Sequence, residues 1–198
     1  MRTRCLIALA AATPLLAGVG AAGAAVKRPP AKKPVCNLVK DDKNDATGTG
    51  TAAAGPNDPA LDIVSADAAT NATTLTAVVR VASLSGSGDT SPAGRAYDVT
   101  FVARGQKVLV RGIVGPGGST WADGKGTGVV DPAKNEIRIS VPLSGLGVAV
   151  KPNDKLTELS ALSWRWVAGT DVVIGRVDTA SGSTPYVAGW PSCVKVGA

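Results

Sequence analysis

The sequence predicts an all-β protein, an antiparallel β-sandwich of jelly-roll type that one disulfide closes. Short runs rich in Val, Thr and Ile alternate apolar with polar side chains, which is typical of half-buried strands. Turns rich in Gly, Asp and Pro separate these runs, a spacing that favours about eight to ten strands in two sheets. No long amphipathic helical pattern interrupts them, so a parallel α/β sheet is disfavoured.

The first two predicted strands cover residues 61–66 and 74–82. In the first, the side expected to be buried holds Leu61, Ile63 and Ser65. In the second, every other residue from Leu75 to Val81 is apolar, so we expect these side chains to face the core.

The clearest hairpin joins residues 97–103 to 107–114 through a short turn at 104–106. A second pair of runs, 129–130 and 137–141, flanks a turn that contains proline at a favoured corner position. Both pairs predict antiparallel neighbours.

The C-terminal part is less regular. Segment 155–166 fits either a strand or a short helical turn, segment 172–177 a strand, and segment 186–196 a closing element. The helical alternative rests on three leucines at helical spacing, Leu156, Leu159 and Leu162.

Residues 1–25 are expected to be a signal peptide, because Arg2 and Arg4 precede an uncharged stretch that ends in small residues. A retained membrane anchor is the alternative, since the uncharged stretch could nearly span a bilayer. Residues 26–35 form a basic, proline-rich linker, and 36–198 form the sandwich domain. We therefore expect a secreted protein with no transmembrane segment in the mature chain. The linker is either a solvated spacer or a weak attachment to anionic envelope polymers.

The basic character belongs to the N-terminal end. The chain has 21 basic and 15 acidic residues, and six of the basic ones precede Cys36. The domain from Cys36 onward therefore has no net charge, which argues against a nucleic-acid-binding face.

Cys36 and Cys193 bracket the predicted domain and are the two cysteines that remain after signal cleavage. In an exported protein an even number of cysteines favours a disulfide, and two cysteines allow one intramolecular pairing. Free thiols or an intermolecular bridge are the alternative.

An acidic loop opens the domain and offers oxygen ligands for a structural Ca²⁺. The candidate ligands are Asp41, Asp42, Asn44 and Asp45. The spacing is not that of an EF-hand, so a further carboxylate such as Asp62 or Asp178 would have to come from elsewhere in the fold. The alternative is a solvated acidic turn.

Three tryptophans are candidate glycan-binding residues: Trp121, Trp164 and Trp166. Trp164 and Trp166 share one face if their segment is a strand, and two flat indoles could stack on sugar rings. Trp121 lies in a predicted glycine-rich loop. The alternative places these rings in the core or over a sheet edge, where Trp buries a large area.

The absence of histidine constrains catalysis. It excludes a Ser-His-Asp triad, a Cys-His pair and histidine-ligated zinc. Two carboxylates suffice for glycoside hydrolysis, and Glu136 and Glu158 are available, but no pair is marked by its spacing or surroundings. We expect no enzyme.

A resemblance to known domains supplements these residue patterns. The order of Asp42, Asn44, Asp45 and Gly48, then Leu61-Asp62-Ile63, then the strand 75–81 resembles the opening of DOMON-like and family-nine carbohydrate-binding-like sandwich domains. The layout is also similar to secreted domains of high-GC Gram-positive bacteria. The resemblance implies an extracellular sandwich, often Ca²⁺-stabilised near its N-terminus and sometimes binding sugars or haem. Haem ligation by histidine is excluded here.

The sequence thus favours a secreted, non-catalytic module at the cell envelope, directed at a cell-wall or extracellular glycan, with Ca²⁺ as a structural ion. Two alternatives stay open: a protein-interaction or adhesion domain, and a carboxylate-based hydrolase.

Overall fold

The computed structural model describes residues 31–47, 57–85, 93–115, 120–122, 126–167 and 173–197. The chain divides into two units, Met1–Ala31 and Lys32–Ala198, and all described strands belong to the second. The predicted signal peptide and the first half of the linker lie outside the described residues. No helix in the described part is long and apolar enough to cross a membrane.

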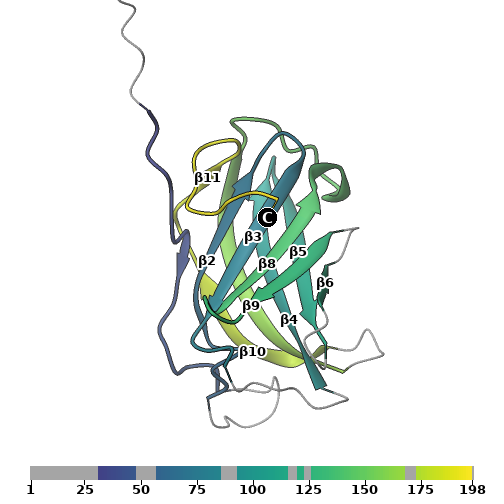
Figure 1. Ribbon diagram of the computed structural model, residues 1–198. Helices are drawn as coiled ribbons and strands as arrows, with labels where there is room; N and C mark the ends of the chain where they lie inside the picture. Colours follow the sequence, from purple (N-terminus) through teal and green to yellow (C-terminus); the bar gives the residue numbers. More distant parts are fainter. Residues whose placement is uncertain are drawn as a thin grey trace, which may run out of the picture. The chain divides into compact units, whose positions relative to one another are not determined.

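Two antiparallel sheets pack face to face, as predicted (Figure 1). Sheet I contains, in spatial order, β1 (Val39–Lys40), β2 (Ile63–Thr70), β3 (Thr74–Val81), β8 (Glu136–Pro142) and β7 (Thr127–Asp131). Sheet II contains β10 (Val173–Ser181), β9 (Lys155–Val167), β4 (Ala93–Ala103), β5 (Gln106–Val114) and β6 (Thr120–Ala122), and β11 (Tyr186–Val187) pairs with β9. The described residues contain no α-helix, only a 3-10 turn at Leu143–Gly145.

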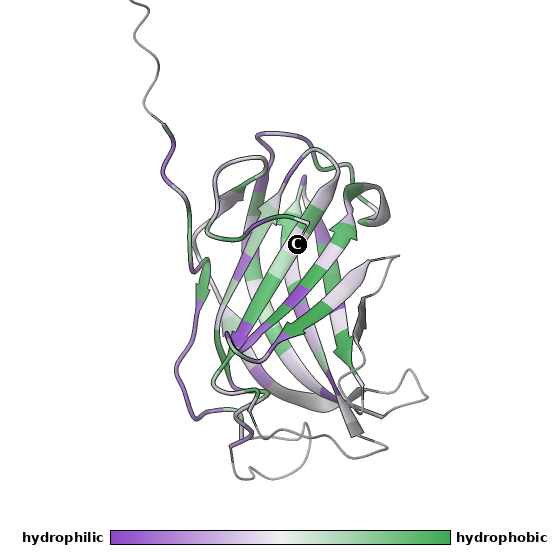
Figure 2. Cartoon of the chain, in the orientation of Figure 1, coloured by the Kyte–Doolittle hydropathy of each residue, from purple (hydrophilic) through white to green (hydrophobic). Residues whose placement is uncertain are grey.

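The core lies between the sheets and is built by the alternation along the strands (Figure 2). Leu75, Ala77 and Val79 of β3 are fully buried there, which confirms the predicted inward face. The largest buried side chains come from both sheets: Tyr97, Phe101, Leu61, Ile63, Ile137, Ile139, Leu156 and Leu159.

Segment 155–166 is a strand, so the helical alternative is wrong. Glu158 has a φ of +52°, and the pairing of β4 with β9 shifts register between Thr100 and Val102. This β-bulge inserts one extra residue. Leu156 and Leu159 therefore both face the core although three positions separate them. The bulge produces the spacing that resembled a helix.

A second register shift places Ser65 on the opposite face of the sheet from the predicted one. The pairing of β2 with β3 slips between Ile63 and Ser65. Ser65 consequently lies on the outer face of sheet I, where Arg80 Nη1 approaches its hydroxyl at 3.4 Å.

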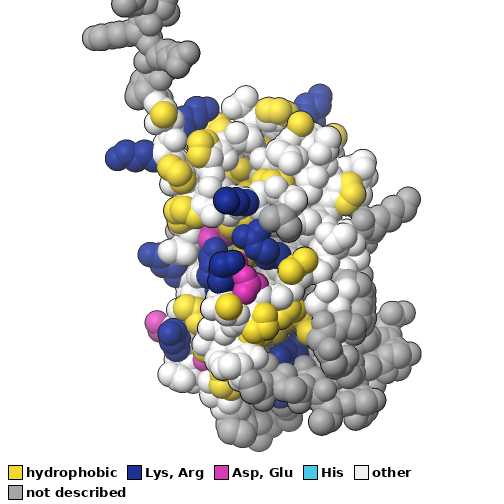
Figure 3. All heavy atoms as spheres, in the orientation of Figure 1, with side chains coloured by type: hydrophobic (Ala, Val, Ile, Leu, Met, Phe, Trp, Pro, Cys, Tyr) yellow, Lys and Arg dark blue, Asp and Glu magenta, His cyan; other side chains and the backbone are white. Residues whose placement is uncertain are grey.

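The outer face of sheet I holds a half-buried ion network. Arg80 donates to Asp67 Oδ2 at 2.6 Å and to Glu136 Oε1 at 2.8 Å. The C-terminal segment covers the neighbouring positions, where Val194 packs on Ala69 and Val78. Figure 3 shows Lys and Arg side chains gathered over the middle of this face, around an acidic group.

The N-terminal segment is fastened to the closing segment. Cys36 and Cys193 form the predicted disulfide, with Cα atoms 5.3 Å apart. Val35 N–H donates to Pro191 O at 3.1 Å, and Lys32 Nζ lies 3.8 Å from the centre of the Trp190 ring. The last residues of the predicted linker thus contact the domain.

Candidate metal centre

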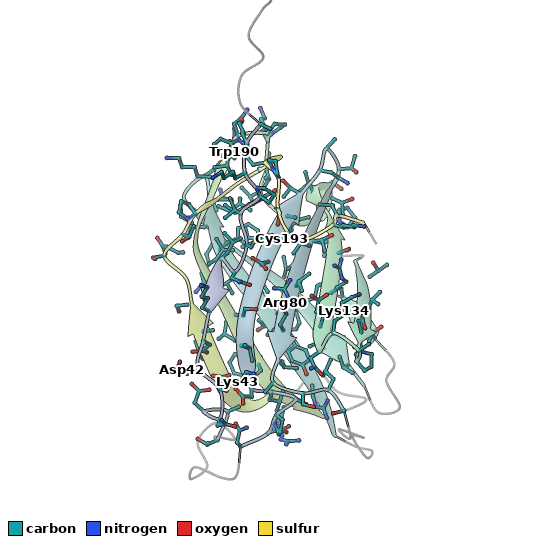
Figure 4. All side chains as sticks on the ribbon, turned by 60° about the vertical axis from the view of Figure 1, so that its left-hand side comes forward. Asp42, Lys43, Arg80, Lys134, Trp190 and Cys193 are labelled. Atoms are coloured by element: carbon teal, nitrogen blue, oxygen red, sulfur yellow. A yellow bond between two sulfur atoms is a disulfide. The ribbon has the colours of Figure 1, made fainter. Side chains whose placement is uncertain are left out.

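The acidic loop leaves β1 and is held against the start of β2. Asp41 N–H donates to Val64 O at 3.1 Å, and Asn44 N–H donates to Asp62 Oδ2 at 2.7 Å. Asn44 reaches this position with a φ of +72°, which Asn tolerates better than most residues. Figure 4 shows Asp42 and Lys43 of this loop towards one end of the sandwich and Trp190 at the other, with Cys193 between Trp190 and the middle.

Three carboxylates converge beside this loop. Asp41, Asp45 and Asp178 each offer an oxygen, and these oxygens all lie within 4.8 Å of one another. Asp178 comes from β10, and backbone groups orient it: Ile63 N–H donates to its Oδ2 at 2.7 Å and Thr179 N–H to its Oδ1 at 2.6 Å. The cluster therefore connects the loop after β1 to strands of both sheets.

The surroundings of the cluster disfavour the ionised form of two of its carboxylates. Partial burial raises the pKa of Asp41 to about 6, and the neighbouring charges of Asp178, Asp45 and Asp42 act in the same direction. Burial also raises the pKa of Asp178, and Asp45 and Asp62 add to this effect against two backbone hydrogen bonds. A bound cation would relieve this repulsion.

Buried oxygens without donors lie around the cluster. Asp41 Oδ2, Asp62 Oδ1 and Asn57 Oδ1 are each shielded from solvent and find no hydrogen-bond partner among the described residues. Asp62 is fully buried, and its other oxygen accepts from Asn57 Nδ2 at 3.0 Å. Leaving a buried carboxylate oxygen without a hydrogen-bond partner costs free energy. Buried oxygens that lack donors therefore indicate a site where a cation can supply the missing interaction.

The donor set selects the class of ion. It consists of carboxylate and amide oxygens, the hard ligands that Ca²⁺ prefers in numbers of six to eight. The chain has no histidine, and Cys36 and Cys193 are joined in the disulfide, so the softer ligands that favour zinc or copper are missing from the described site.

The structure brings together two of the four loop residues that the sequence nominated. Asp41 and Asp45 join the cluster, whereas Asp42 is exposed and Asn44 contributes a backbone N–H to Asp62. Asp178, one of the two outside carboxylates considered, completes the triad. Gly48, the expected bend, lies outside the described residues.

Asn57 was not identified from the sequence. It precedes the first predicted strand in a polar stretch, and nothing in its surroundings distinguishes it from a surface asparagine. Its hydrogen bond to Asp62 becomes visible only in the folded chain.

The predicted tryptophans lie in sheet II. Ser163 Oγ donates to Leu61 O, and Arg165 donates to the carboxylate of Asp58, so both side chains lie on the inner face of β9. Trp164 lies between them in the strand and therefore on the outer face, where it is half-buried. Trp121 lies in β6 and pairs through its backbone with Ile113, so its predicted place in a loop is wrong. Trp166 pairs with Gly94 and Val173. The side chains of Trp121 and Trp166 are outside the described set.

Glu136 and Glu158 do not form a catalytic pair. Glu136 is buried beside Arg80 on sheet I, and Glu158 is exposed on the bulge of sheet II. No protein-family model and no curated protein matches the chain.

Proposed function

We propose that the protein is an exported, non-catalytic binding module of the cell envelope, directed at glycans and held together at its loop end by Ca²⁺. One observation carries the cation site: three carboxylates converge, and buried oxygens of Asp41 and of the adjoining pair Asn57 and Asp62 lack donors in the described structure. Burial, together with repulsion from neighbouring carboxylates, raises the pKa values of Asp41 and Asp178, and a divalent cation supplies the missing positive charge.

The proposed compartment suits such a site. Extracellular modules bind Ca²⁺ with dissociation constants of about 10⁻⁴–10⁻³ M, because the surrounding concentration is high. A site assembled from one loop and strand β10, with Asp45 exposed, fits this weak class. The disulfide between Cys36 and Cys193 fits an oxidising compartment as well.

Hydrolysis by the same carboxylates is a weaker proposal. An acid–base pair needs oxygens that can reach a substrate, but both oxygens of Asp178 accept backbone hydrogen bonds. Those oxygens can still coordinate an ion through their remaining lone pairs.

Thermal unfolding with Ca²⁺ and with EDTA tests the cation site. At a Ca²⁺ concentration of about 100 times Kd the gain is about 2.7 kcal/mol, or about 5–10 °C in Tm for a domain of this size. Asp178→Asn should lose this response. Asp131→Asn should keep it, because Asp131 lies far along the chain on the β7–β8 turn and pairs with Lys134. An identical Tm in Ca²⁺ and EDTA would refute the site.

A further inference from the structure

The outer face of sheet II carries a row of hydroxyl side chains in register. Ser181 of β10 pairs with Ser160 of β9, and Ser160 pairs with Thr100 of β4. The hydroxyls of Thr100 and Ser160 are hydrogen-bonded at 2.6 Å. Leu109 of β5 extends the row, and half of its surface is exposed. The hydroxyl row therefore crosses three adjacent strands, from exposed Ser181 through half-buried Ser160 to buried Thr100.

The three hydroxyl residues of this row, Thr100, Ser160 and Ser181, line an open hollow of about 370 Å³. Lys107 and Glu158 frame it with opposite charges, and both are exposed. Ser181 and Gly182 also line a second hollow of about 390 Å³, which continues to Asn37, Lys40, Ser183 and Thr184. We call the two hollows together the trough, defined by the hydroxyl row, its framing charges and the residues around Gly182.

Gly182 is required where the two hollows meet. A Cβ at this position would lie 2.0 Å from Leu38 O. Only glycine lets the N-terminal segment pass so close to the end of β10. The close approach places Asn37 and Lys40 in line with the hydroxyl row instead of on a separate surface.

The bulge at Glu158 aims a carboxylate at the edge of the trough. A φ of +52° is uncommon for glutamate and costs the chain conformational free energy. Bulges in strands often redirect a side chain next to a binding site. Glu158 lies between Leu159, which is buried in the core, and the solvent-exposed mouth of the hollow.

We propose that the trough binds an oligosaccharide chain, with the hydroxyl row and Glu158 hydrogen-bonding sugar hydroxyls. Several lining residues carry uncharged hydroxyl or amide groups, which both donate and accept and thus match a polyol: Asn37, Thr100, Ser160, Ser181, Ser183 and Thr184. An apolar ligand would leave these groups without partners. Glu158 balances one of the two lysines, Lys40 and Lys107, which leaves a single net positive charge, too little to select a polyanion over a neutral glycan.

This inference rests on the proposed role as a glycan-directed module, but its test is independent of the cation. If the trough fails to bind while Ca²⁺ still raises Tm, the location falls and the cation site stands. If the trough binds an oligosaccharide while Ca²⁺ leaves Tm unchanged, the cation site is refuted and the trough stands.

An NMR titration of the ¹⁵N-labelled domain with linear gluco-, xylo- and mannohexaose provides the test. At least one hexasaccharide should shift the amides around Thr100, Ser160 and Ser181. An oligogalacturonate of the same length serves as the anionic probe. No shift with any neutral probe at millimolar concentration would overturn the proposal, as would shifts confined to sheet I.

Single variants then measure the contacts. Glu158→Gln and Ser181→Ala should each weaken binding about three- to tenfold, the worth of one or two hydrogen bonds. Thr127→Ala is the matched control, because it removes an exposed hydroxyl from the outer face of sheet I. Unchanged spectra away from the trough confirm folding. Equal affinity of all three variants would contradict the proposed site.

Discussion

Removing Ca²⁺ should reverse the way stability depends on pH. In EDTA the pKa of Asp41 is about 6 in the folded protein against 3.8 ordinarily. The folded state then binds the proton more readily than the unfolded chain. Stability is therefore highest below about pH 4 for this group and falls as the pH rises towards 6 and above.

The size of the effect follows from the pKa difference. The interval between 3.8 and about 6 corresponds to about 3 kcal/mol, at about 1.36 kcal/mol per pH unit. Asp41 is only partly buried, so solvent screening reduces this to about 1–2 kcal/mol. The raised pKa of Asp178 acts in the same direction.

Saturating Ca²⁺ should change the sign. The ion binds the ionised carboxylates and competes with protons, so binding strengthens as the pH rises from 4 to 7. The contribution of the cluster to stability should then increase over the interval in which it decreases in EDTA.

Urea unfolding followed by tryptophan fluorescence measures both curves between pH 4 and 7. Subtracting the curve of Asp41→Asn isolates the cluster. The subtraction cancels the contributions of other groups, such as Asp131 and Asp154, which change stability with pH in the opposite direction. Their pKa values are lowered by Lys134 and by the Lys151 backbone, respectively. A difference curve that is flat in EDTA, or one that has the same slope with and without Ca²⁺, would refute the reasoning.

Three further changes have defined outcomes. Arg80→Met leaves the buried acid Asp67 without its cation and should cost about 3 kcal/mol, measured by the urea midpoint; an unchanged midpoint would show the network to be energetically neutral. Gly182→Ala forces a Cβ against the backbone of Leu38 and should lower the free energy of unfolding by more than about 1 kcal/mol. Cys36→Ser opens a link across 157 residues and should cost up to about 5 kcal/mol; a loss below 1 kcal/mol would contradict the entropic estimate.

The strands that the sequence predicted best are those with unbroken alternation. β3 has the expected inward face and the β4–β5 hairpin the expected antiparallel pairing, because every residue there keeps the period of two. Where a bulge interrupts that period, prediction failed. Ser65 was assigned to the wrong face, and Leu156 and Leu159 suggested a helix. A bulge is fixed by pairing with the neighbouring strand, which the local sequence does not contain.

The candidate metal centre was predictable only in part for a related reason. The acidic loop concentrates oxygens within a few residues, so Asp41 and Asp45 could be nominated. Asp178 enters through a hydrogen bond with Ile63, 115 residues away along the chain. Long-range contacts of this kind follow from the sheet order, in which β10 and β2 belong to different sheets. The composition of the loop carries no information about them.

The segment from Cys36 to Asp45 should be released only when both of its fastenings are removed. Its strand β1 pairs with β2 through two residues, too few to hold the segment alone. The disulfide holds one end and the proposed cation the other. Hydrogen exchange of Leu38 N–H, which donates to Asp67 Oδ1 at 3.0 Å, reports release. The Leu38 amide should stay protected in the unmodified protein in EDTA and in Cys36→Ser with Ca²⁺. In Cys36→Ser in EDTA its exchange should be much faster than the effects of the two single changes predict. Equal protection in all four states would show that β1 packing suffices, and that neither fastening holds the segment in place.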